Sequence, residues 1–277
     1  MSDLTPPAVG LAGEGVLALR FQQAKARFDA RDWMGAILEA EELLEEAPDH
    51  LEALFLVGEA SLELGDAHGA DAAYARFLEL VPRHPLALCG MGIARFELTD
   101  MDGCLMCTQA ALEQDSESPE AWYYQGLAQE WQGLADEAKA SLEKAASLDG
   151  NRYPRVEALQ ESDWNDALLK AFSLLDEPLA RWIQAVPLTS HHLPSLEVLH
   201  SAEPPLSPFS TGLYRGTPPT PGEKAWETHP EELRLYRVNL ERLAHHQGDL
   251  PRRIAEVLRA EALDWLALPL DSHPLLP

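Results

Sequence analysis

The chain of 277 residues is long enough for two modest domains, each with a core of its own. Its 46 acidic and 21 basic side chains leave a formal charge of −25, which repels phosphate backbones and anionic lipid headgroups. Nucleic acid and membrane surfaces are therefore excluded as expected partners. Residues 1–150 hold 28 of the acids and nine of the bases, so the acidity belongs mainly to the first half.

Nothing in the sequence predicts export or membrane insertion. Met1–Gly10 carries no basic residue, and Leu11–Leu19 is too polar for the apolar part of a signal peptide. No run of about 18 apolar residues follows, so no membrane span is expected. The three cysteines are an odd number, which does not suit the disulfide framework of a secreted fold. We expect a cytoplasmic protein with reduced thiols.

A period of 34 residues organises the chain from about residue 17 to residue 150, after an N-terminal arm at residues 1–16. Three columns of equivalent positions recur at this interval. They hold glycines, small residues and prolines, respectively: Gly58, Gly92 and Gly126, preceded by Ala24; Ala36, Ala70, Cys104 and Ala138; and Pro48 and Pro82. Small residues let two helices cross closely, and proline ends a helix because it cannot continue the hydrogen-bond ladder.

These columns resemble the tetratricopeptide repeat, most clearly in Pro119–Gly150. Bulky, small and turn residues stand there in the order of the repeat: Trp122, Gly126, Gly133, Ala138, Leu142 and Ala145. The resemblance implies four helix pairs, at approximately residues 17–50, 51–84, 85–118 and 119–150, stacked into an α-solenoid. The expected fold class is mainly α, with this solenoid followed by a smaller α+β domain at residues 152–277.

The resemblance also implies a concave face, built from the first helix of each pair, where a partner helix or extended peptide lies. Helical spacing places twelve residues there: Phe21, Lys25, Phe28, Phe55, Glu59, Leu62, Cys89, Ile93, Phe96, Tyr123, Leu127 and Glu130. They predict an apolar groove with an acidic rim, which suits an amphipathic or basic-flanked segment of another protein.

Two other interpretations of the groove follow from the same residues. Some tetratricopeptide proteins clamp the C-terminal carboxylate of a chaperone with lysines and asparagines at these positions. Since Lys25 is the only such residue here, that mode of binding is not expected. Alternatively, the groove is filled by the N-terminal arm or by the second domain of the same chain.

The period is lost after Asp149, and a proline-rich sequence of different composition follows. Trp164–Ile183 has helical spacing but is expected to break or kink at Pro178. Leu196–His200 and Leu233–Val238 have the pattern of short strands. Arg252–Leu268 is predicted to be a long amphipathic helix, begun by Asp249 and Pro251 in capping positions.

This second domain resembles small bacterial metallopeptidases of the minimal zincin type. Three stretches carry the resemblance: Trp182–Pro194, Thr211–Pro218 and Leu233–Leu268. In that family the last helix carries His-Glu-x-x-His, in which two histidines one turn apart bind zinc and the glutamate activates a water. Here Glu261 remains, but Ala260 and Asp264 stand in place of the histidines. The sequence therefore predicts no catalytic residue, no bound metal and no cofactor.

Other motifs are interpreted as structural. His191-His192 and His245-His246 are adjacent pairs whose side chains point apart on any regular element, as is usual in solvated loops. Cys104-x-x-Cys107 has no second pair, and residue 104 already fits a helix crossing. No phosphate-binding loop or nucleophile elbow is present.

The leading hypothesis is a non-enzymatic adaptor or regulator, such as a chaperone or inhibitor of a partner protein, with a pseudoenzyme domain as a second surface. One competing hypothesis is a metal-dependent peptidase or hydrolase with a rearranged site around Glu261. Another is that the second domain only caps the apolar end that every repeat stack must cover.

Overall fold

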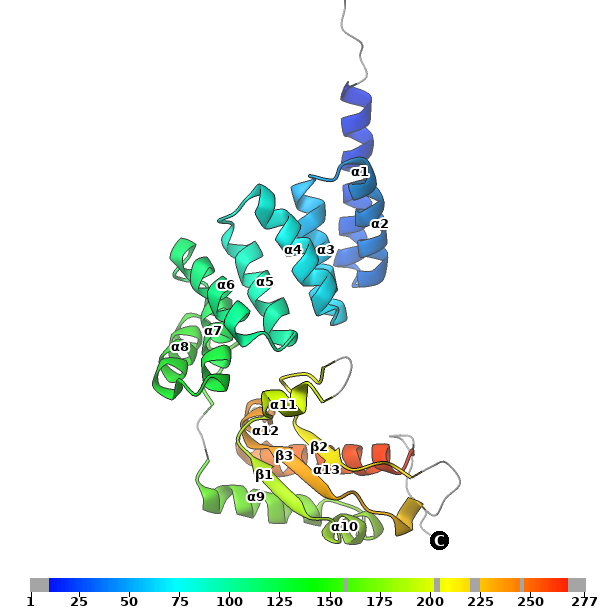
Figure 1. The fold of residues 1–277 in the computed structure, drawn as a ribbon, viewed down its shortest axis with the longest axis vertical. Helices are drawn as coiled ribbons and strands as arrows, with labels where there is room; N and C mark the ends of the chain where they lie inside the picture. Colours follow the sequence, from blue (N-terminus) through cyan, green and yellow to red (C-terminus); the bar gives the residue numbers. More distant parts are fainter. Residues whose placement is uncertain (1–9, 157–158, 202–204, 220–224, 245–246, 269–277) are drawn as a thin grey trace, which may run out of the picture. The chain divides into compact units, whose positions relative to one another are not determined.

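The computed structural model describes residues 10–156, 159–201, 205–219, 225–244 and 247–268. The chain divides into two compact units, which we call the repeat unit (residues 1–155) and the sheet unit (residues 156–277). The repeat unit is entirely helical where it is described, and the sheet unit mixes helices with a small sheet (Figure 1). The predicted fold class, a mainly α solenoid followed by a smaller α+β domain, is confirmed.

The repeat unit consists of four helix pairs packed one after another. Their bounds are α1 Gly10–Asp29, α2 Trp33–Glu46, α3 Leu51–Leu64, α4 Ala67–Leu80, α5 Pro85–Glu97, α6 Met101–Gln114, α7 Pro119–Trp131 and α8 Ala135–Leu148. Helices α3, α5 and α7 begin at the residues where the 34-residue period starts the second, third and fourth pairs. Helix α1 begins earlier than the first pair was predicted to start, and it includes part of the expected N-terminal arm.

Helix caps repeat with the same period as the glycines. Asp32, Asp66 and Asp100 cap α2, α4 and α6, and each carboxylate accepts a hydrogen bond from a glycine N–H three residues on. His50, His84 and Ser118 cap α3, α5 and α7 in the same way. Each of these side chains satisfies a backbone donor that the first turn of a helix leaves unpaired.

The glycine column lies where the two helices of a pair cross, as predicted. A Cβ atom on Gly58 would lie 2.7 Å from the ring of Tyr74, and one on Gly126 would lie 2.7 Å from the side chain of Leu142. At Gly92 the corresponding contact is Thr108, at 2.9 Å. The second column, Ala36, Ala70, Cys104 and Ala138, is buried. Both columns must hold small residues, because larger side chains would separate the helices.

The sheet unit is built on a three-stranded sheet in the order β1-β3-β2. Strand β1 (Leu188–His191) runs parallel to β3 (Glu232–Tyr236), and β2 (Gly212–Arg215) runs antiparallel to it. The helices are α9 Glu161–Ser173, α10 Glu177–Gln184, α11 Leu196–Leu199, α12 Arg237–Leu243 and α13 Leu250–Trp265, with short 3-10 turns at Ala225–Glu227 and Gln247–Asp249. The three stretches that resemble zincins contain β1, β2 and all of β3 except its first residue, Glu232.

Helices α9, α10 and α13 cover one face of this sheet (Figure 1). Leu233 and Leu235 of β3 point into the resulting core, where they join Trp164, Ile183 and Leu258. The indole N–H of Trp164 donates to Ser190 Oγ at 3.1 Å, and the guanidinium of Arg237 lies 4.9 Å from its ring. The residues that alternate with the core positions lie on the other face.

Several predictions for the sheet unit need correction. Leu196–His200 is not a strand, because Ser195 Oγ accepts from the N–H of Val198 and starts α11. The strand predicted at Leu233–Val238 ends at Tyr236, where α12 begins. Strands β1 and β2, and α12, were not predicted. Four-residue strands are too short to show a clear alternation of apolar and polar residues.

The predicted helices of the sheet unit agree more closely with the structure. The break expected at Pro178 separates α9 from α10, with Pro178 in the first turn of α10. Helix α13 starts two residues before the predicted Arg252. Asp249 lies at its N-cap position but makes no capping hydrogen bond, although Pro251 lies in the first turn as expected.

Candidate functional site

An open groove of about 690 Å³ lies along α1 and α3 of the repeat unit. Its walls are mainly apolar and aromatic, because the first helices of two neighbouring pairs turn these side chains toward the same concave face. The lining residues are Phe21, Lys25, Phe28, Asp29, Leu51, Glu52, Phe55, Leu56, Glu59, Phe77, Val81, His84 and Leu86. The volume lies in the range of pockets that hold small ligands or the side chains of a bound peptide.

Five of the twelve predicted residues line this groove: Phe21, Lys25, Phe28, Phe55 and Glu59. Leu62, Ile93, Tyr123 and Glu130 are partly buried and lie outside it. Cys89, Phe96 and Leu127 are 3%, 0% and 0% exposed, so the expectation that they face an open groove is wrong. Phe96 packs on Tyr124 and Trp131 of α7, and Cys89 packs with Ala121 of the same helix, so the first helices also supply contacts between neighbouring pairs.

The predicted set also missed residues from the end of α4 and the turn into α5. Phe77 lies 5.8 Å from Phe55 between ring centroids, and His84 lies 5.0 Å from Phe77. The missed residues Phe77, Val81 and His84 form one wall of the groove. The sequence carries a signal for this wall, because His50 and His84 occupy equivalent positions of the 34-residue repeat. In the structure the His50 ring lies 5.4 Å from the Phe21 ring, as the His84 ring lies against Phe77. These wall residues do not belong to the first helices, so the periodicity of those helices does not predict the wall.

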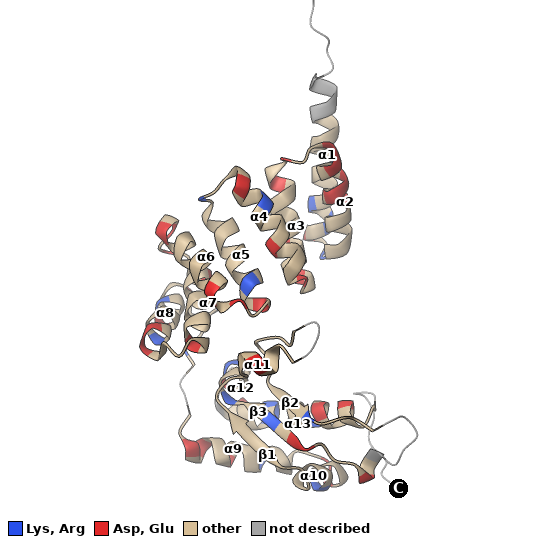
Figure 2. Ribbon diagram, viewed as in Figure 1, with Lys and Arg blue, Asp and Glu red and all other residues tan. Residues whose placement is uncertain are grey.

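The groove carries three carboxylates and one ammonium group. Lys25 Nζ lies 3.4 Å from Asp29 within the same helix, so the one lysine of the lining is paired. Glu59 Oε1 accepts a hydrogen bond of 2.5 Å from the hydroxyl of Tyr74. Burial raises the pKa of the Glu59 carboxyl above its ordinary value, and the hydrogen bond from Tyr74 opposes this shift. Figure 2 shows how widely acidic residues are distributed over the helices of the repeat unit.

The opposite end of the solenoid is closed by the chain itself. Arg152 Nη2 lies 2.5 Å from Glu120 of α7, and the Tyr153 hydroxyl donates to the same carboxylate at 3.1 Å. The Tyr153 ring packs on Tyr123 with centroids 4.6 Å apart. The chain thus covers its own concave face at the fourth pair, whereas no described residue of the repeat unit fills the groove along α1 and α3. Residues 1–9 of the N-terminal arm, which are predicted as one possible occupant, lie outside the described residues.

The stretch Ala260–Asp264, predicted to be a degenerate zinc motif, lies on α13, and its Glu261 meets strand β2. Glu261 Oε2 accepts a hydrogen bond of 3.3 Å from the backbone N–H of Tyr214. Burial raises the pKa of the Glu261 carboxyl. Burial and the nearby Asp264 raise the pKa of the Tyr214 hydroxyl to about 12. The Tyr214 ring packs edge-on against Trp265, so this glutamate belongs to the contact between β2 and α13.

Ala260 and Asp264 do not supply the two zinc-binding imidazoles of the zincin motif. Ala260 has no donor atom, and Asp264 is exposed on the surface of α13. Within the described ranges, no group of three or more histidine, cysteine, aspartate and glutamate side chains is placed to hold a metal. The pair His245-His246 lies outside the described residues. All three cysteines are buried as free thiols, and Cys104 Sγ lies 3.7 Å from the carbonyl of Tyr124.

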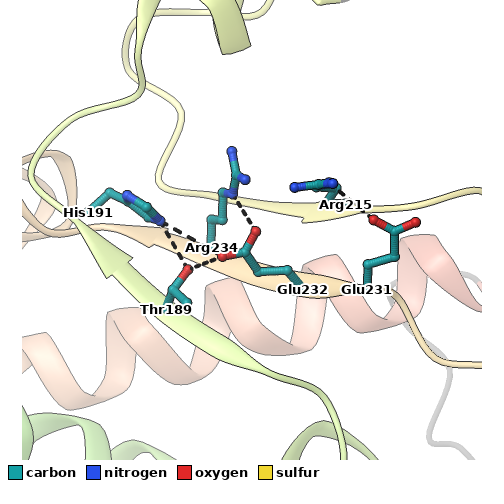
Figure 3. Close-up of polar contacts among 6 residues, drawn as sticks. All are labelled: Thr189, His191, Arg215, Glu231, Glu232 and Arg234. Carbon is teal, nitrogen blue, oxygen red and sulfur yellow. Dashed lines mark hydrogen bonds and ion pairs between the residues drawn. The ribbon is translucent and has the colours of Figure 1, made fainter.

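A polar network covers the sheet face that points away from the helices (Figure 3). Glu232 of β3 accepts hydrogen bonds from Thr189 Oγ1 at 2.7 Å and from Arg234 Nε at 2.8 Å. Nε2 of His191 lies 3.0 Å from Thr189 Oγ1, and Arg215 pairs with Glu231 at 3.1 Å. The hydrogen bond from Thr189 and the guanidinium of Arg234 lower the pKa of Glu232. These groups satisfy one another across the three strands.

The two units match different protein families. The tetratricopeptide repeat family matches residues 52–84 and 120–151, and the zincin-like metallopeptidase family matches residues 183–264. No curated protein matches the chain in sequence. Within the described residues, no helix is long and apolar enough to cross a membrane.

Solved structures of MamA are similar to part of the chain. A crystal structure of MamA protein is 22% identical over 48% of this chain and 72% of its own, with a TM-score of 0.46. MamA 41-end from Desulfovibrio magneticus RS-1 is 17% identical over 48% of this chain and 75% of its own, also with a TM-score of 0.46. These likenesses are too partial to bear on function. The family matches show tetratricopeptide repeats in the repeat unit and a region of the sheet unit that is similar to zincin-like metallopeptidases.

Proposed function

We propose that this protein is a non-enzymatic adaptor or regulator that holds a segment of a partner protein in the groove along α1 and α3. The observation that carries the proposal is the open apolar groove itself. Aromatic rings from two helix pairs line it, and Leu86 at its edge is 55% exposed. Apolar groups left uncovered in this way are typical of surfaces that bind another polypeptide.

The sheet unit enters the proposal as a pseudo-metallopeptidase domain that offers a second surface. This is supported by Ala260, which cannot bind zinc, and by Glu261, whose carboxylate accepts from the backbone of β2. In zincins the corresponding glutamate activates a zinc-bound water. The free buried cysteines support a cytoplasmic site of action.

Partner capture by the full chain tests the proposal. Leu86→Asp places a charge in the groove at an exposed position, so it should abolish capture without unfolding the helices. Met106→Asp is the matched control, because Met106 is 68% exposed on α6 and lies outside the groove. Mass spectrometry of the captured proteins should show one partner that Leu86→Asp loses and Met106→Asp retains. Equal capture by both variants would refute the groove as the binding site.

Metal analysis tests the pseudoenzyme part separately. The purified full chain should bind less than stoichiometric zinc, and Glu261→Gln should not change that content. One zinc per chain, lost in Glu261→Gln, would instead establish a rearranged metal site.

A further inference from the structure

One face of α3 presents an acid, an aromatic ring and a second acid to the groove. Glu52, Phe55 and Glu59 stand at positions i, i+3 and i+7, and all three line the groove. Because an α-helix rises 1.5 Å per residue, the two carboxylates are separated by about 10 Å along the helix. A complementary ligand must therefore present two positive charges at the same spacing, with an apolar group between them.

Neither carboxylate is neutralised by the histidines at the start of α3 and α5. Nδ1 of His50 lies 3.4 Å from Glu52 Oε2 but also accepts a hydrogen bond from the N–H of Ala53. Nδ1 of His84 accepts from the N–H of Ala87. Both Nδ1 atoms therefore act as acceptors for backbone N–H groups and donate no hydrogen bond to the two glutamates. Lys25 is engaged with Asp29, which leaves the negative charge of α3 to an incoming cation.

We infer that the occupant of the groove is a helical segment of a partner protein with basic residues seven positions apart and bulky apolar residues between them. This inference rests on the proposed function and specifies its ligand. A helix repeats its side chains at i and i+7 over about 10 Å, which matches the two glutamates of α3. An extended chain presents same-face side chains at about 7 or 13 Å, which match less well.

The apolar residues of the partner helix, which lie between its two basic residues, contact the remaining walls of the groove. Phe55 and Leu56 of α3, with Val81 at the end of α4 and Leu86 of α5, line the same groove as the two acids. Burial of one or two leucine-sized side chains there supplies the affinity, and the two ion pairs orient the helix. The net charge of the repeat unit aids encounter with such a cationic segment.

Two synthetic helices of identical composition test this chemistry on the full chain. Both are alanine-rich peptides of about 16 residues with two lysines and two leucines. The first has the lysines seven positions apart with the leucines between them on one face, and the second has them five positions apart on different faces. Fluorescence anisotropy should show roughly tenfold tighter binding of the first peptide, and this preference should weaken in high salt.

Protein variants locate the contact. Glu52→Gln should weaken the first peptide roughly threefold, as expected for a single exposed ion pair, and Glu59→Gln, which changes a half-buried carboxyl, should weaken it by at least as much. Glu59→Gln keeps an oxygen for the Tyr74 hydroxyl, so the fold of α3 and α4 is retained. Glu41→Gln, at an exposed position of α2 outside the groove, is the matched control and should change nothing.

Equal binding of the two peptides, or binding insensitive to Glu52→Gln and Glu59→Gln, would overturn the inference. If Leu86→Asp nevertheless abolished partner capture, the proposed function would stand and only the ligand chemistry would be wrong. A dimer of the full chain that Leu86→Asp dissociates in analytical ultracentrifugation would also overturn it, because the occupant would then be a second copy.

Discussion

The two ends of the solenoid use the same kind of helix face in opposite ways. At the fourth pair, Tyr153 covers Tyr123 and Arg152 neutralises Glu120, so the chain closes its own concave face. At the first two pairs, Phe21 and Phe55 line an open groove. Equivalent positions therefore serve stability at one end and are available for a ligand at the other. The repeat pattern alone does not distinguish these outcomes.

The largest expected effect tests whether the sheet unit has a core independent of the solenoid. Trp164→Ala removes a buried indole from the contact between α9 and the sheet. It should lower the free energy of unfolding of the sheet unit by about 3–5 kcal/mol. Urea unfolding followed by far-UV circular dichroism should then show two separated transitions. A single transition shifted as a whole would mean that the units unfold together.

The helix crossings of the solenoid are tested by the same substitution at two glycines. Gly58→Ala brings a methyl group within 2.7 Å of the Tyr74 ring and should cost about 1–3 kcal/mol. Gly15→Ala meets nothing within 4 Å on α1 and should stabilise the protein by about 0.5–1 kcal/mol. Thermal unfolding of both variants gives the comparison. Effects of the same sign would contradict the assigned role of the glycine column.

The missing cap of the fourth pair provides a smaller test. Leu134 occupies the N-cap of α8 with φ −85° and ψ 67°, close to the φ −86° and ψ 71° of Asp32, but has no side-chain acceptor. Leu134→Ser should therefore stabilise the solenoid by about 0.5–1 kcal/mol, whereas Asp100→Ala should destabilise it by about 1 kcal/mol. Chemical denaturation measures both changes. No gain from Leu134→Ser would show that packing of the leucine outweighs the cap.

The smallest effect concerns the pH dependence that Glu261 confers. Burial raises its pKa in the folded state, so the folded protein holds this proton more tightly than the unfolded chain. The wild type should therefore gain stability relative to Glu261→Gln as the pH falls through the folded pKa toward the unfolded one. Denaturation midpoints of both proteins between neutral and acidic pH measure this difference. An opposite trend would mean that the hydrogen bond from Tyr214 outweighs burial.

The sequence predicts the parts of the fold whose signal recurs along the chain better than the parts whose signal occurs once. Gly58, Gly92 and Gly126 mark the crossings because the same steric demand recurs every 34 residues. Strands β1 and β2 have four residues each and no repeated signal, so they were missed, and Ser195 outweighed the strand pattern of the residues after it. Half-burial was the hardest feature to predict, since Phe55 and Cys89 occupy equivalent positions of the repeat but only Phe55 lines the groove.

Hydrogen–deuterium exchange of the full chain, with and without its captured partner, tests the central claim most directly. If the partner lies in the groove, amide exchange should slow in α1, α3 and the turn between α4 and α5, and α7 and α13 should be unaffected. Protection confined to the sheet unit, or to α7 and α8, would contradict the claim that the open groove binds the partner.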